Sequence, residues 1–150
     1  LCGLSWSDFY ETEDGVIGTD RRVDEFLTAL AEILAEDGGD GSPGTVLVAG
    51  IDLAHVGVRF GASDGLDAQK LARLKARDLA TLSLVAAGDR DGFVRQTLAE
   101  RDERHLCGFG ALYALLSLLP GADGQVIAYD QSVDPDQSSA VTFAALRFEG

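Results

Sequence analysis

The sequence contains no methionine, two cysteines, three prolines and no long apolar run. Cys2 and Cys107 lie far apart in the chain, so they form no disulfide framework and are typical of a reducing compartment. No apolar stretch approaches the ~20 residues that span a bilayer, and we expect no basic and apolar leader. We therefore expect a cytoplasmic protein without a membrane segment.

Basic residues are also scarce. There are 12 Lys and Arg residues against 25 Asp and Glu residues, which gives a formal net charge of -13. Nucleic acid and anionic membrane surfaces would repel such a chain, so neither is an expected partner. Because the chain begins at Leu1 and contains no Met, we expect it to be part of a longer protein.

What is present is the composition of one globular domain. Hydrophobic residues make up 46% of the chain and charged residues 25%, as in ordinary soluble domains. A chain of 150 residues is long enough for one core and too short for two. We expect a single domain over residues 1–150.

The chain is organised around an apolar run at residues 46–51. Its aliphatic and β-branched residues are flanked by Pro43-Gly44 and by Asp52, which predicts a central strand buried on both faces. Helical patterns surround it, and two further strands are expected near the end. This alternation predicts an α/β fold with a mostly parallel or mixed sheet and helices on both faces, a three-layer architecture. The first expected helix begins near residue 20, and three more are expected at 67–87, 92–103 and 111–119. The two further strands are expected at 125–129 and 140–148.

Asp52 and His55 follow the central strand, and ligands bind outside the carboxyl ends of strands in open α/β sheets. An acid and a histidine three residues apart can hold a metal, move a proton or orient each other. The alternative is a histidine that only bonds a nearby backbone group. A glycine-bracketed loop comes next, between Gly57 and Gly61.

Cys107 precedes the expected helix at 111–119. The positive end of a helix favours the thiolate that metal ligation or nucleophilic attack requires, whereas the alternative is a small buried thiol. Strand ends and the starts of the following helices share one sheet edge, so we expect His55 and Cys107 to face one cleft. The strand end at residues 129–132 should form part of its wall.

Asp78 falls on the apolar stripe of the helix expected at 67–87, where an unpaired carboxylate would be costly. We expect it behind the cleft as a supporting carboxylate. The charge run at residues 101–104 is expected to be solvated, and His105 beside it is expected at the surface.

The residues DLAHVGVRFG at 52–61 resemble the signature of the Memo-like family, the protein B of the AmmeMemoRadiSam group. The resemblance continues through Asp78 and three further segments, and it covers roughly residues 45–148 with agreeing order and spacing. The family is related in fold to the extradiol ring-cleaving dioxygenases, the class III non-haem iron enzymes. The further segments are residues 106–108, 129–132 and 141–145.

The resemblance implies a metal site near the carboxyl edge of the sheet. In the family, two histidines from the N-terminal half and the cysteine matching Cys107 hold the metal, with residues matching Asp52 and His55 beside it. This chain would be the C-terminal portion and would contribute part of the site, so it should hold metal weakly or not at all. The candidate catalytic residues are Asp52, His55 and Cys107, and the candidate ligands His55 and Cys107 suit iron, copper or zinc, with redox chemistry as one use.

Other functions stay open. Ile51 and Ala54 depart from the polar pattern of the family, which is compatible with a non-catalytic binding or scaffold module that keeps the fold. An extradiol-dioxygenase-like enzyme would use two histidines and a carboxylate, and a hydrolase built on Cys107 and His55 would need a base and an oxyanion pocket. The sequence indicates no substrate. Self-association through an exposed strand edge, with an apolar strip near residues 1–6, is the expected partner interaction.

Overall fold

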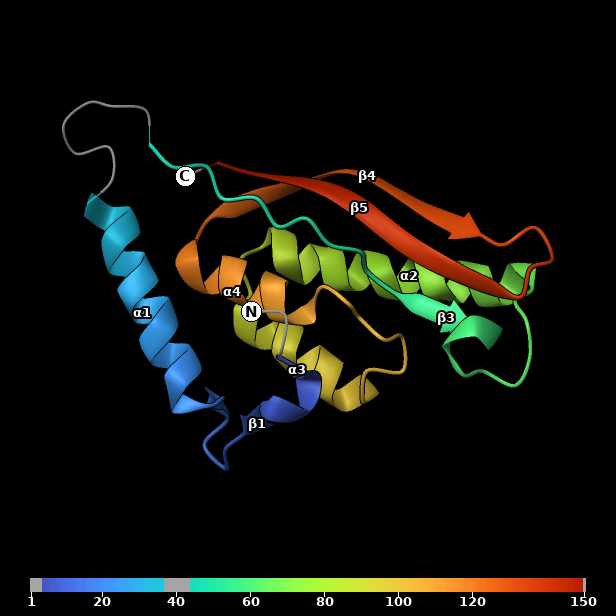
Figure 1. The fold of residues 1–150 in the computed structure, drawn as a ribbon, viewed down its shortest axis with the longest axis horizontal. Coiled ribbons are helices and arrows are strands. Elements are labelled where there is room, and N and C mark those ends of the chain that lie inside the picture. Colours follow the sequence, from blue (N-terminus) through green and yellow to red (C-terminus); the bar gives the residue numbers. More distant parts are fainter. Residues whose placement is uncertain (1–3, 37–43, 150) are drawn as a thin grey trace.

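The computed structural model describes residues 4–36 and 44–149 of the chain (Figure 1). The expectations about Cys2 and the first three residues lie outside this part. The elements in chain order are η1 (Trp6–Asp8), β1 (Tyr10–Glu11), β2 (Ile17–Gly18), α1 (Arg21–Glu36), β3 (His55–Gly57), η2 (Val58–Phe60), α2 (Ala68–Ala86), α3 (Arg90–Glu100), α4 (Phe109–Leu118), β4 (Asp123–Val133) and β5 (Ser139–Glu149).

Helices α2 and α3 begin where their capping residues predict. The side chain of Asp67 accepts a hydrogen bond from the Lys70 N–H at 2.7 Å at the start of α2. Asp89 accepts from the Gly92 N–H at 2.9 Å at the start of α3. Each cap satisfies a backbone donor that has no partner within the helix. The helix expected at 67–87 is confirmed as α2.

The described strands form two small antiparallel sheets. β1 pairs with β2, and a second sheet has the order β3-β5-β4. In Figure 1, α2 runs beneath the long β4–β5 ribbon, with α3 and α4 on the other side of α2 and α1 beside α4. The main core lies between these layers, and its fully buried apolar residues include Ala54, Leu82, Val85, Phe93 and Val94.

The expected three-layer fold with a mostly parallel or mixed sheet is wrong, because every strand pair in the described residues is antiparallel. The strands expected at 125–129 and 140–148 leave residues 130–139 to a loop, but residues 130–133 continue β4 and Ser139 begins β5. Only residues 134–138 then separate β4 from β5. A connection that short can close a hairpin, whereas parallel neighbours need a crossover of about a dozen residues or more.

The central, fully buried strand expected at residues 46–51 is also wrong. This segment runs beside β5 in Figure 1 but belongs to no strand, and it makes no backbone hydrogen bond to another described residue. Val46 and Val48 are 81% and 83% exposed. An apolar run becomes a strand only where a neighbouring backbone pairs with it, and here pairing with β5 begins at Leu53.

Helix α1 packs less tightly than its apolar pattern predicts. Leu27 is its one buried residue in the described part, while Phe26 and Ile33 are 50% and 65% exposed. Across the described residues, no helix is long and apolar enough to cross a membrane. Self-association stays a prediction.

Candidate functional site

Two backbone hydrogen bonds bring the segment of His55 against the segment of Cys107. The N–H of His55 donates to the carbonyl of Arg104 at 2.7 Å. The N–H of Cys107 donates to the carbonyl of Leu53 at 3.2 Å. The start of β3 and the connection between α3 and α4 therefore lie side by side, although they are far apart in sequence.

The other edge of the same segment is attached to β5 through Thr142. The N–H of Leu53 donates to the Thr142 carbonyl at 2.8 Å, and the Thr142 N–H donates to the Ala54 carbonyl at 3.0 Å. The Thr142 hydroxyl accepts from the Ala54 N–H at 3.0 Å. Thr142 and Ala54 are fully buried. Residues 53–55 are therefore held on one side by the connection between α3 and α4 and on the other side by β5.

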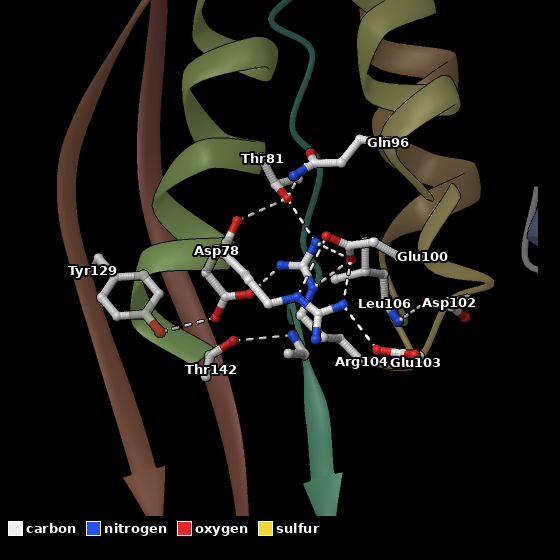
Figure 2. Close-up of polar contacts among 12 residues, drawn as sticks. Asp78, Thr81, Gln96, Glu100, Asp102, Glu103, Arg104, Leu106, Tyr129 and Thr142 are labelled. Carbon is white, nitrogen blue, oxygen red and sulfur yellow. Dashed lines mark hydrogen bonds and ion pairs between the residues drawn. The ribbon is translucent and has the colours of Figure 1, made fainter. Parts of the chain in front are cut away.

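His55 and Cys107 line the same hollow, which has a volume of about 430 Å³. Aromatic rings of Trp6, Phe60 and Phe109 form much of its apolar lining. The shared cleft expected from the sequence is therefore present. The expected wall at residues 129–132 is not part of it, because Tyr129 points to Asp78 instead (Figure 2).

The His55 ring is largely buried, and its two nitrogen atoms lack hydrogen-bond partners among the described side chains. Its side chain is 19% exposed, and its Nε2 lies 3.8 Å from Oδ2 of Asp52, which is beyond hydrogen-bond distance. The ring meets Phe60 edge-on with centroids 5.1 Å apart. Its Nδ1 is buried and has no hydrogen-bond partner among the described residues. A buried polar atom without a partner is unusual and is often found at functional positions.

Cys107 is an exposed free thiol at the approach to α4. The N-cap of that helix is Gly108, so Cys107 lies just outside the helix. A Cβ at position 108 would lie 2.2 Å from Ile51 Cδ1 and 2.8 Å from the carbonyl oxygen of Asp52. The glycine therefore lets the start of α4 approach the Asp52 segment closely.

Asp78 is fully buried, as expected, and its partner is Arg104 rather than water. The prediction that residues 101–104 form a solvated run is wrong for Arg104, which is 2% exposed. Sequence reasoning missed this residue, although a buried acid on an apolar stripe indicates that some cation must reach it. His105 is exposed, as expected, but it also lines the hollow.

The described residues do not form a complete metal site. No group of three or more His, Cys, Asp or Glu side chains in this part of the chain is arranged to hold an ion. Asp102 and His105 also line the hollow, and Oδ1 of Asp102 accepts from the Leu106 N–H at 2.7 Å. Zinc sites use three or four protein ligands, so His55 and Cys107 alone supply part of a coordination sphere.

The fold and the hollow define a mixed α/β protein in which a histidine and a cysteine from distant segments share one pocket. The chain belongs to the Memo-like family, because the family model described as Memo-like protein matches residues 17–147, most of its length. The resemblance based on residues 52–61 and the later segments is thereby confirmed. None of the curated proteins matches the chain.

Proposed function

We propose that this Memo-like chain contributes Cys107 and His55 to a metal-binding site, with Asp52 as the neighbouring acid, 3.8 Å from the imidazole. The observation that carries the proposal is the shared hollow, which joins an exposed thiol and a largely buried imidazole. Thiolate and imidazole together suit iron, copper or zinc. The remaining ligands would have to come from outside the described residues. Binding by this chain alone should therefore be weak.

An extradiol-dioxygenase-like site receives less support. His55, His105 and Asp102 line the hollow and are the residue types of a two-histidine, one-carboxylate site. These groups, however, do not gather as a set of three donors in the described part of the chain. Of these two alternatives, the aromatic lining of the hollow favours the second, a non-catalytic module that binds an apolar or planar molecule.

Titration with Co²⁺ and Zn²⁺ tests the metal proposal. We expect weak Co²⁺ binding that produces a thiolate-to-cobalt absorption band, and the band should disappear in Cys107→Ser. Cys2→Ser is the matched control and should keep the band. His55→Gln should weaken binding by about tenfold or more.

Two results would overturn the proposal. One is tight, stoichiometric binding that survives Cys107→Ser, which would place the metal elsewhere. The other is the absence of any signal that depends on Cys107. In that case, binding of a planar aromatic probe that depends on Phe60 and Phe109 would favour the non-catalytic module.

A further inference from the structure

Arg104 is the largest fully buried side chain in the described part of the protein. Its guanidinium donates to three side chains: Nη1 to Asp78 Oδ1 at 2.5 Å, Nη2 to Thr81 Oγ1 at 2.8 Å and Nε to Glu100 Oε2 at 2.9 Å (Figure 2). A charge removed from water in this way is tolerated only when it is fully paired.

The Asp78–Arg104 pair joins three parts of the fold. Asp78 comes from α2, and Arg104 comes from the connection between α3 and α4. The second oxygen of Asp78 accepts from the Tyr129 hydroxyl on β4 at 2.8 Å. The Tyr129 oxygen in turn accepts from Gln131 Nε2 at 2.9 Å. A displacement of Arg104 would therefore disturb contacts with both the helical layer and the sheet.

The connection that carries Arg104 has an unusual backbone. Arg101 and Asp102 have φ values of 50°, and His105 has a φ of 48°. Three non-glycine residues in the left-handed region within five positions raise the free energy of this turn. Such conformations persist only when the surrounding structure determines them, and they cluster at functional sites.

The strained turn leads directly into the proposed site. The carbonyl of Arg104 accepts the His55 N–H, and the chain reaches Cys107 three residues later. A buried ion pair adds little stability compared with well-packed apolar side chains. The planar guanidinium of the arginine, with its fork of N–H donors, can however fix the direction of the backbone from which the side chain extends.

We infer that Arg104 is a positioning residue: anchored by Asp78, Thr81 and Glu100, it holds the strained turn at residues 101–105 against β3 and so fixes Cys107 relative to His55. The inference deepens the proposed function and relies on it only for the metal readout. The backbone geometry of the two amides supplies a second readout that does not involve metal.

Arg104→Lys tests the inference, because lysine keeps the charge and loses the fork. Hydrogen exchange of the His55 and Cys107 amides should become at least about tenfold faster relative to the Leu82 amide in the core of α2. Co²⁺ affinity should fall at least about tenfold. Arg95→Lys is the matched control, because Arg95 is an exposed arginine that pairs with Glu11 at 2.7 Å, and it should change neither quantity.

Val85→Ala separates positioning from general destabilisation. It removes buried volume from α2, so it should speed exchange of all core amides together. The ratio of the His55 and Cys107 exchange rates to the Leu82 rate, and the Co²⁺ affinity, should stay unchanged. If Arg104→Lys behaves like Arg95→Lys or like Val85→Ala, the inference is wrong.

Two further outcomes remain informative. If Arg104→Lys does not fold, Tyr129→Phe removes only the hydroxyl that supports Asp78 and should shift both readouts in the same direction by less; no shift would contradict the inference. If the wild type binds no Co²⁺, the proposed function fails, while the exchange ratio still decides whether Arg104 positions the two segments.

Discussion

Asp78 carries the clearest residue-scale signal in the sequence. It lies four residues after Leu74 and four before Leu82, so helical spacing alone places a carboxylate on the buried stripe of α2. Its partner could not be predicted in the same way. Arg104 follows the exposed residues Arg101 and Glu103, and a run of charges does not indicate which member turns inward.

Tyr129 gives this buried cluster a pH dependence. Burial, and then the hydrogen bond to Asp78, raises the pKa of Tyr129 above its usual value. The folded protein therefore holds the phenol proton more tightly than the unfolded chain does. The resulting stabilisation is complete below the unfolded pKa of about 10 and is lost as the pH rises through the folded pKa.

We expect the free energy of unfolding of the wild type to decrease more steeply than that of Tyr129→Phe above about pH 10. Urea unfolding at a series of pH values measures both slopes. Tyr10→Phe, at an exposed position, is the control and should follow the wild type. The Lys75 Nζ lies 5.9 Å from the centroid of the Tyr129 ring, so the pH series should also be measured on Lys75→Gln to separate the titration of the lysine from that of the tyrosine. Identical slopes for wild type and Tyr129→Phe would contradict the prediction.

At the scale of elements, helices could be predicted and strand pairing could not. The start of α2 depends on Asp67 and its own next three residues, which are local in sequence. A strand depends on a partner far along the chain. The apolar run at 46–51 has the stronger strand composition, yet the mostly polar residues 130–133 form part of a strand because β5 returns beside them.

Two glycines next to the site test how the end of β3 is built. Gly57 has a φ of 104° and a ψ of -168°, and a Cβ there would lie 2.3 Å from the Ser138 carbonyl oxygen. Gly61 has a φ of 92°, but no atom lies within 4 Å of a Cβ built there. The first position combines strain with a backbone collision, and the second has strain alone.

Gly57→Ala should therefore reduce the free energy of unfolding by about 3 kcal/mol or more, because the β3–β5 register must shift. Gly61→Ala should reduce it by about 1–2 kcal/mol. Urea unfolding of both variants measures the difference. Equal losses would mean that the turn at Ser138 moves aside without cost, and that the close approach does not fix β3.

At the scale of the whole molecule, the sequence predicted the family and not the layers. The family resemblance rests on short segments whose order survives any error about sheet topology, such as residues 52–61 and 106–108. The shared hollow was predicted for the same reason, since His55 and Cys107 lie inside those segments and both line it. The layer arrangement failed because it depended on the pairing of residues 46–51, which local sequence does not determine.

The net charge of -13 is the other property of the whole molecule with a testable consequence. Like charges over a small surface repel one another and destabilise the compact state. Exposed ion pairs such as Arg21–Glu25 contribute little in return, and the buried Asp78–Arg104 pair is hardly screened by salt. Relief of self-repulsion should therefore dominate the response to salt.

We expect the free energy of unfolding to rise as NaCl increases from about 10 mM to about 150 mM, where the Debye length shrinks from ~30 Å to ~8 Å. Urea unfolding in each salt concentration measures the effect, and NaCl is preferred because sulfate also stabilises proteins through exclusion from their surface. Neutralising Glu13, Asp14 and Glu32 to their amides removes three exposed acids that form no ion pair with another described residue. This variant should be more stable than the wild type at low salt and should respond less to NaCl. If wild-type stability falls as salt is added, the surface ion pairs outweigh the self-repulsion and the prediction is wrong.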